Sequence, residues 1–147
     1  MTSASAFEFV DRVTSDLCFV ARGASVEDVF AASAEALLAA TVEDPGTVTA
    51  RVRRSLALEE PALDLLLLRF LNELIYWKDA EQLLLRPETL RVSQAGAARL
   101  EAQLAGERID PSRHRLEGDV KAATAHGLRV GPGGGDGGWE AAVTLDV

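Results

Sequence analysis

A strongly apolar segment, residues 61–78, constrains the fold of this 147-residue chain more than any other feature. Nine of its side chains are leucine, isoleucine or phenylalanine, and they leave almost no polar face. A helix that is apolar nearly all round is buried, so we predict a central core helix with Pro61 in its first turn. No apolar run in the chain approaches the roughly 20 residues that a membrane-spanning helix needs.

Shorter patterned segments on both sides of this helix predict a second helix and several strands. The second helix has Ser25 as its N-cap, continues with apolar residues at three-to-four spacing, and ends before the turn at 44–46. Strands are predicted at residues 7–10, 17–21, 47–58, 83–85, 90–92, 99–104, 120–130 and 139–147, with Pro87 at a bend. This order predicts a single α+β domain over residues 1–147, with a mostly antiparallel sheet packed against two helices.

Two polar stretches are predicted to be connections. Residues 106–118 are rich in charge, and Arg113 and His114 within them are predicted to form a surface turn. Residues 131–138 are mostly glycine. They do not predict a phosphate-binding loop, because neither a Lys-Ser/Thr pair nor a helix follows them.

The charge balance weighs against nucleic-acid binding. The net charge is −8, whereas phosphate contacts require clustered lysine and arginine. An acidic surface is better suited to a basic protein partner or a divalent cation. Cys18 is the single cysteine, which excludes an internal disulfide, and its apolar neighbours predict a buried structural thiol. The first residues lack the basic and long apolar regions of a signal peptide, so we expect a cytoplasmic protein without membrane contact.

No standard catalytic constellation is present, so no catalytic residue is assigned. Asp16 directly precedes an apolar strand, and Asp146 stands beside the terminal carboxylate of Val147. Taken singly, Asp16 fits a turn carboxylate and Asp146 a polar chain end. Such anionic groups repel at close range unless a cation or a basic side chain lies between them, and oxygen-only ligands suit Mg²⁺, Ca²⁺ or Mn²⁺. Lys121 and His126 fit an ordinary solvated lysine and a structural histidine.

Six short motifs, in order and at matching spacing, resemble the archease family along almost the whole chain. They are 13–16 for His-Thr-Ala-Asp, 25–30 for the start of the first helix, 71–76 for LNELLY, 106–114 for GExxDPxxH, 120–126 for VKAxTYH, and 145–147 for the terminal hydrophobic-Asp-hydrophobic signature. Three family residues are replaced. Val13 stands in place of the histidine, Ala125 in place of the tyrosine, and Asp119 in place of a glutamate.

The resemblance implies an accessory role rather than catalysis. Archeases assist an RtcB-type RNA ligase in tRNA splicing and RNA repair, by promoting guanylylation of the ligase and multiple turnover. The family binds a divalent metal through groups that correspond here to Asp16, Asp146 and the Val147 carboxylate. Lys121 corresponds to a lysine near that site, where it balances charge or contacts the ligase, and His126 belongs to the same motif.

Two other functions stay open at this point. One is a stand-alone metal-dependent enzyme that acts on phosphates or RNA. The other is a diverged interaction module without ligase activity, which the replacements at Val13 and Ala125 favour. Direct RNA binding is not expected in the accessory role, because the chain is acidic and lacks a basic stripe.

Overall fold

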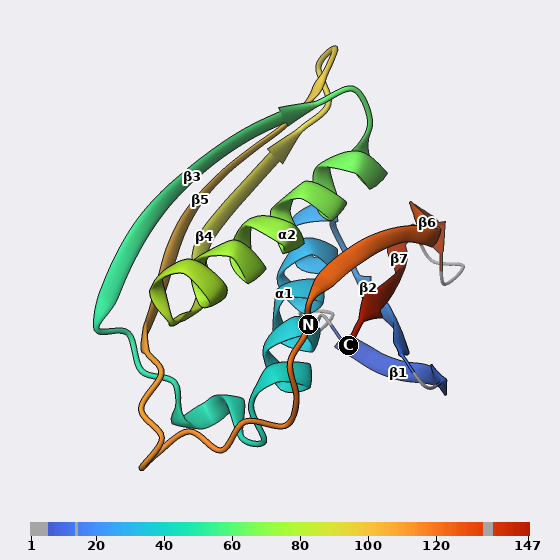
Figure 1. Ribbon diagram of the computed structural model, residues 1–147. Coiled ribbons are helices and arrows are strands. Elements are labelled where there is room, and N and C mark those ends of the chain that lie inside the picture. Colours follow the sequence, from blue (N-terminus) through green and yellow to red (C-terminus); the bar gives the residue numbers. More distant parts are fainter. Residues whose placement is uncertain (1–5, 14, 134–136) are drawn as a thin grey trace.

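The computed structural model describes residues 6–13, 15–133 and 137–147. Within these ranges the chain forms two α-helices, one short 3-10 helix and seven strands (Figure 1). In chain order they are β1 (Ala6–Val13), β2 (Asp16–Gly23), α1 (Val26–Thr41), η1 (Pro45–Thr47), β3 (Val52–Glu60), α2 (Leu63–Glu81), β4 (Leu83–Ser93), β5 (Ala98–Arg108), β6 (Ala122–Gly133) and β7 (Gly138–Asp146).

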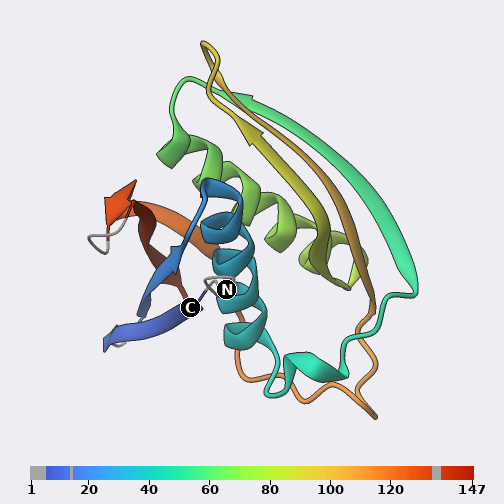
Figure 2. The same cartoon turned by 180° about the vertical axis from the view of Figure 1, so that it is seen from behind.

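The strands form two sheets, with the two helices between them. One sheet has the order β1-β2-β7-β6 and the other β3-β5-β4, and every pairing is antiparallel. Helix α1 contacts β1, β2 and β7 on one side and β4 on the other, while α2 contacts β6 and the three-stranded sheet (Figures 1 and 2). The predicted α+β class, antiparallel pairing and two helices are confirmed. The structure adds that the antiparallel strands are divided between two sheets.

Helix α2 is the main apolar anchor, as predicted, although its limits and one of its faces differ. It begins at Leu63, so Pro61 lies before the helix instead of in its first turn, and it ends at Glu81. Its buried side chains include Leu66, Leu67, Phe70 and Leu71, all fully enclosed. Leu65 and Tyr76 are exposed, so the helix is not apolar all round in its packing. Contact with two sheets covers two sides of the helix and leaves a third open to solvent.

Helix α1 begins as the sequence predicts. The Ser25 side chain accepts a hydrogen bond of 3.1 Å from the Asp28 amide, which is an N-cap contact. Gly23 precedes this cap, and a Cβ atom there would lie 2.5 Å from the Cβ of Asp28. The close approach of strand β2 to helix α1 therefore requires a glycine. Phe30 of α1 stacks on Phe70 of α2 with ring centroids 6.0 Å apart, which joins the two helices in one core.

Several predicted strand limits change for local reasons. The strand predicted from residue 47 begins at Val52, because Pro45–Thr47 forms a 3-10 helix capped by the Asp44 side chain. The two predicted pieces around Pro87 are one strand, β4, with a pairing irregularity between Pro87 and Thr89. A proline is tolerated there because β4 is an edge strand. Strand β5 continues to Arg108, into the predicted connection, and the tip of the glycine-rich loop lies outside the described residues.

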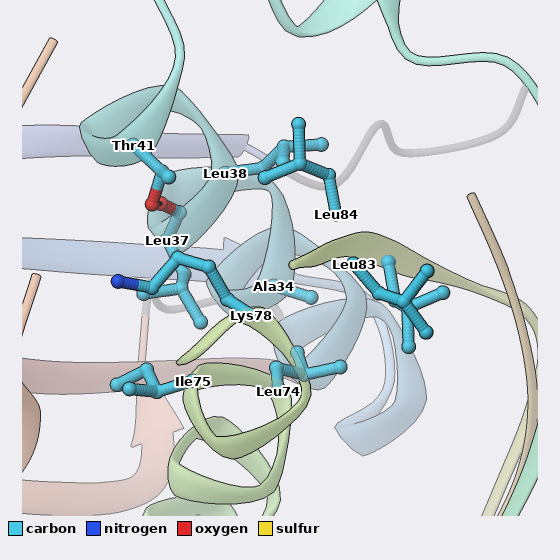
Figure 3. Close-up of a pocket in the computed structure, with 10 residues that line it drawn as sticks. Ala34, Leu37, Leu38, Thr41, Leu74, Ile75, Lys78, Leu83 and Leu84 are labelled. Atoms are coloured by element: carbon cyan, nitrogen blue, oxygen red, sulfur yellow. Dashed lines mark hydrogen bonds between the residues drawn. The ribbon is translucent and has the colours of Figure 1, made fainter. Parts of the chain in front are cut away.

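A small cavity remains between α1, α2 and β4 (Figure 3). Its volume is about 20 Å³, room for about one water molecule, so it is a packing gap and not a ligand pocket. Lys78 lies at its edge, and its Nζ atom donates to Asp119 Oδ1 and to the Val120 carbonyl, each at 3.1 Å. These bonds attach the segment before β6 to α2. None of the helices in the described ranges is long and apolar enough to cross a bilayer.

Candidate functional site

Asp16 and Asp146 lie directly opposite each other in the four-stranded sheet. Asp16 is the first residue of β2 and Asp146 the last residue of β7, and the antiparallel register pairs them. Directly opposed residues project from the same face, with Cβ atoms roughly 4.5–5.5 Å apart. Their neighbours Leu17 and Leu145 are buried toward the helices, so the two aspartates belong to the outer face of the sheet.

Within residues 6–13, 15–133 and 137–147, no basic side chain compensates either charge. Among the described residues, Asp16 and Asp146 have no ion-pair partner within 4.0 Å and no side-chain hydrogen bond. Like charges directly opposite each other destabilise a sheet. This arrangement suits a ligand that brings positive charge from outside the chain.

The chain end is fixed next to this pair by backbone hydrogen bonds. The Val147 amide donates to the Ser15 carbonyl at 2.9 Å, and the Lys121 amide donates to the Asp146 carbonyl at 2.8 Å. The terminal carboxylate therefore lies one residue beyond Asp146, beside the β1–β2 turn. The two side-chain carboxylates, with Val147 as the next residue, present oxygen donors of the kind that hard divalent cations accept.

The other predicted site residues are placed less centrally. Lys121 directly precedes β6 and is exposed, and its contact with the pair runs through its backbone. His126 is exposed and lies further along β6, in the irregular stretch between Thr124 and Arg129. The structure thus gathers Asp16, Asp146 and the chain end, brings the backbone of Lys121 to them, and leaves His126 at a distance along the strand.

One further motif position, Val13, lies at the edge of this site. Val13, which replaces the family histidine, is the backbone partner of Asp16 in the β1–β2 hairpin, and Thr14 lies outside the described residues.

Cys18 was expected to be a buried thiol, but it is half-buried on the outer face. Its sulfur lies 3.3 Å from Thr144 Oγ1, in the cross-strand pair two positions along from the aspartates. The error arises because alternation in β2 turns Leu17 and Phe19, and not Cys18, toward the core.

No cluster of three or more His, Cys, Asp or Glu side chains suited to a metal ion occurs in residues 6–13, 15–133 and 137–147. The candidate set has two such side chains, and its third charged group is the chain terminus. Any cation there would complete its coordination with water or with groups of a partner, as Mg²⁺ and Ca²⁺ commonly do.

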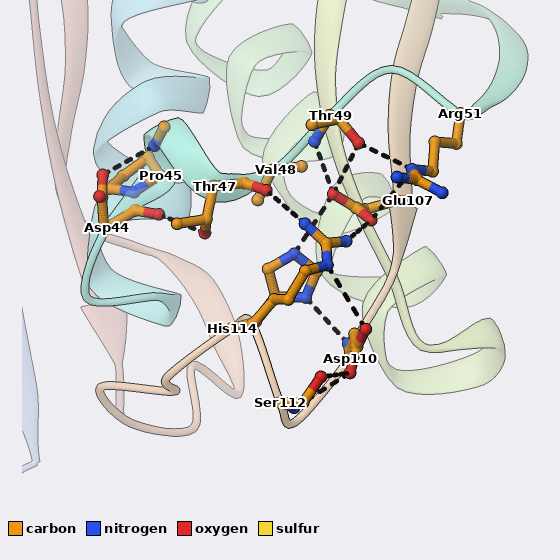
Figure 4. A network of polar contacts seen from close by, with 12 residues as sticks. Asp44, Pro45, Thr47, Val48, Thr49, Arg51, Glu107, Asp110, Ser112 and His114 are labelled. Carbon is orange, nitrogen blue, oxygen red and sulfur yellow. Dashed lines mark hydrogen bonds and ion pairs between the residues drawn. The ribbon is translucent and has the colours of Figure 1, made fainter.

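Sequence reasoning missed a buried polar network around Glu107 (Figure 4). Its carboxylate accepts hydrogen bonds from the Thr49 amide at 2.6 Å and the Thr49 hydroxyl at 2.9 Å, and it pairs with Arg113. His114, predicted to lie in a surface turn, is buried, with Nε2 3.3 Å from Glu107 Oε2. The Asp110 amide donates to His114 Nδ1 at 2.8 Å, so the neutral imidazole carries its proton on Nε2.

The electrostatics of Glu107 are those of a structural anion. Burial alone raises the pKa of this carboxyl, but the hydrogen bonds from Thr49 and the pairing with Arg113 outweigh it and lower the pKa to about 2. Glu107 therefore stays ionised at any physiological pH. The network ties the connection between β5 and β6 to the segment before β3. The GExxDPxxH motif was the signal for it, although the contact with Thr49 crosses 58 residues of sequence.

Asn72 of the 71–76 motif explains how β6 is positioned. Strand β6 is an edge strand, so its outward backbone groups have no strand partner. Asn72 Nδ2 donates to the Ala123 carbonyl at 3.0 Å, and the Ala123 amide donates to Asn72 Oδ1 at 2.9 Å. This paired contact attaches the start of β6, next to Lys121, to helix α2.

Comparisons with known protein sequences all point to one family, the archeases. The sequence profile of the Archease protein family (MTH1598/TM1083) matches residues 7–147. Protein archease from Methanosarcina mazei is 30% identical over 144 residues, which is 96% of this chain and 95% of that protein. Protein archease from Pyrococcus abyssi is 31% identical over 137 residues, covering 91% of this chain and 94% of its own.

Solved structures show the same fold. The solution structure of protein 1598 from Methanobacterium thermoautotrophicum matches with a TM-score of 0.80 at 30% identity, covering 96% of this chain and 98% of its own. The crystal structure of an archease from Thermotoga maritima matches with a TM-score of 0.59 at 13% identity. The match covers 95% of this chain and 99% of that chain. This second similarity supports the fold alone.

Proposed function

This chain belongs to the archease family, and from that premise we propose that it is an accessory protein that activates an RtcB-type RNA ligase in tRNA splicing or RNA repair. In this role it promotes guanylylation of the ligase and multiple turnover, and it does not itself catalyse the joining of RNA. We place this activity in the cytoplasm.

The second part of the proposal is a divalent cation, Ca²⁺, Mg²⁺ or Mn²⁺, held by Asp16, Asp146 and the Val147 carboxylate. The observation that carries it is the direct pairing of Asp16 with Asp146 on the outer face of the sheet. When bound, the cation would supply positive charge and Lewis acidity at a surface that a partner protein reaches. The chain's own groups hold it: β2 and β7 fix the two aspartates, and the Ser15 carbonyl fixes the last residue.

Lys121 and His126 are proposed to act around this centre and not as ligands. The backbone of Lys121 is bonded to Asp146, while its exposed ammonium is available to balance charge or to contact the ligase. His126 is an exposed residue of β6, the edge strand that Lys121 directly precedes. We expect it to contribute less, because it is further along β6.

The distribution of basic residues favours a protein partner over free RNA. On the outer face of the three-stranded sheet, Arg53 is paired with Glu88 at 2.9 Å and Arg99 with Glu59 at 2.8 Å. Paired arginines offer little to phosphate groups, and the whole chain carries a net charge of −8. Titration with a tRNA-like RNA at moderate salt should therefore show little binding.

The direct test is a guanylylation assay of the ligase with GTP, with and without this protein, followed by RNA joining under multiple turnover. An accessory protein raises both rates and does nothing to RNA alone. Turnover of RNA or of a phosphate ester by the protein alone would favour the stand-alone enzyme. No effect in either assay would favour the diverged interaction module. Calorimetric titration with Ca²⁺, Mg²⁺ and Mn²⁺ separately tests the metal centre.

A further inference from the structure

The surface is hollowed where β1 meets the end of α1, on the helix side of the four-stranded sheet. A depression of about 580 Å³ lies between the second half of β1, the last turn of α1, residues 117–119 and Val147. Its volume falls within the range of roughly 300–1,000 Å³ that is usual for binding pockets. Val147, the residue after Asp146, is a wall of this depression, which we call the terminal hollow.

A β-bulge supplies the apolar part of the terminal hollow. Phe9 pairs with Phe19 and Asp11 with Cys18, so Val10 is the extra residue of the bulge. Successive side chains of a regular strand point to opposite faces, yet Phe9 and Val10 both line the hollow. They are 41% and 53% exposed, among the few large apolar side chains left open to solvent. Adjacent exposed apolar groups in a depression are typical of a protein contact surface.

Acidic groups form the rest of the wall. Asp11, Glu117 and Asp119 line the terminal hollow together with the C-terminal residue, against a single arginine, Arg12. A smaller depression of about 290 Å³ shares residues 117–119 and adds Leu116, Asp79 and Lys78, whose ammonium pairs with Asp79 at 3.0 Å and with Asp119 at 3.1 Å. Lys78 thus partly neutralises this neighbouring surface, and the combination of exposed apolar and acidic side chains is centred on the terminal hollow. It is complementary to positive charge and repels phosphate.

We propose that the terminal hollow docks a segment of the partner ligase in which a bulky apolar side chain is flanked by lysine or arginine. The apolar side chain fills the space against Phe9 and Val10, and the basic groups face Asp11 and Glu117. This inference rests on the proposed function, and it deepens that function by assigning the surface on which the partner docks.

The test uses Val10→Ser and Glu117→Lys, each with a matched control elsewhere. Leu65→Ser changes an exposed apolar residue of α2, and Glu101→Lys reverses an exposed charge on the three-stranded sheet. Affinity for the ligase is measured at low and physiological salt. Thermal melting and calcium titration confirm that each variant folds and keeps its metal centre. We expect both hollow variants to bind the ligase roughly tenfold more weakly, and both controls to stay within about twofold of wild type.

The outcomes separate the docking surface from the function itself. If wild type activates the ligase and the hollow variants bind it as tightly as wild type, the docking surface is refuted while the function stands. If wild type neither binds nor activates the ligase, both proposals are refuted. Sedimentation of wild type and Val10→Ser adds one more outcome: self-association that the substitution abolishes would assign the terminal hollow to a second copy of this chain.

Discussion

The two ends of the paired strands β2 and β7 differ in how their opposed charged residues are compensated. At one end Arg22 lies opposite Glu140, and at the other Asp16 lies opposite Asp146. Arg22 bonds Glu140 at 3.0 Å and Glu8 at 2.8 Å, and Arg129 adds a second contact to Glu140 at 2.6 Å. The Arg22 end is a closed network of opposite charges. The Asp16 end consists of like charges that the described residues leave uncompensated.

The contrast teaches where to look for function in this sheet. Hydrogen bonds from Arg129, and then from Arg22, lower the pKa of Glu140 although burial opposes this. The charges at that end need nothing from outside the chain. At the Asp16 end, like charges are retained at a cost to stability, on the same two strands that elsewhere pair opposite charges. A cation bound from outside the chain would offset the repulsion between Asp16 and Asp146.

The largest expected effect comes from neutralising the open end. Asp16→Asn and Asp146→Asn each remove one charged ligand, and we expect loss of ligase activation together with at least a roughly tenfold loss of calcium affinity. Even residues that only orient metal ligands cost about 10–100-fold when replaced. The melting temperature should stay constant or rise, because a repulsion is removed. Calcium titration, guanylylation assays and thermal melting measure the three quantities.

Glu140→Gln is the matched carboxylate-to-amide change at the closed end, and it should leave calcium affinity and activation at wild-type levels. Equal losses at both ends would contradict the distinction between them. An unchanged calcium affinity in both aspartate variants would remove the metal centre altogether.

Glu107 provides the next largest effect and a third case for comparison, a buried carboxylate satisfied within the chain. Glu107→Gln leaves Arg113 without its anionic partner and weakens the bonds to Thr49, so we expect a loss of about 1–3 kcal/mol in the free energy of unfolding near pH 7. Urea unfolding of both proteins measures this difference. Calcium affinity should not change, because the network lies apart from the aspartate pair.

The pH dependence of Glu107 has a definite sign. Its pKa in the folded protein is about 2, below the ordinary value of 4.5. The stabilisation is therefore complete above about pH 4.5 and is lost as the pH falls toward 2. Urea unfolding between pH 5 and 3 should show wild type losing stability faster than Glu107→Gln. Parallel curves would mean that Glu107 is not the group responsible.

Lengthening the chain by one glycine after Val147 should also weaken the open end. The extension moves the terminal carboxylate away from Asp146 and leaves both aspartates in place, so we expect a calcium affinity lower by roughly tenfold and reduced activation. A one-glycine extension at the N-terminus is the control. Normal activation by the C-terminally extended protein would exclude the terminal carboxylate as a ligand.

The sequence predicted those features of the fold that depend on local patterns, namely the helices and the existence of the strands. Apolar spacing predicted α1 and α2, and the Ser25 cap marked where α1 begins. Which strands share a sheet was not predictable, because alternation of period two shows that a segment is a strand and not which strand it pairs with. The early end predicted for β5 has the same origin, since residues 106–108 are polar in composition yet continue the pairing with β4, and Gly106 also pairs with β3.

The candidate site was predicted through family resemblance more than through residue chemistry. Taken singly, Asp16 and Asp146 fit a turn and a chain end, and only the register of β2 and β7 places them opposite each other. His114 was misplaced because its burial depends on Glu107 and, through it, on Thr49 in a distant segment. Contacts of this kind follow from topology, which local sequence does not encode.

The smallest expected effect on stability comes from converting one end of the β2–β7 pair into the other. Asp146→Arg places an arginine opposite Asp16, as Arg22 lies opposite Glu140, and an opposite-charge cross-strand pair contributes about 0.2–1 kcal/mol. We therefore expect a modest gain in the free energy of unfolding together with complete loss of calcium binding. The reverse substitution, Arg22→Glu, opposes Glu140 with a like charge and should reduce stability without creating calcium binding, because no chain terminus lies there. Urea unfolding in 50 mM and 500 mM salt measures both variants, and salt should shrink both differences by screening. A destabilised Asp146→Arg, or calcium binding by Arg22→Glu, would show that charge pairing alone does not distinguish the two ends.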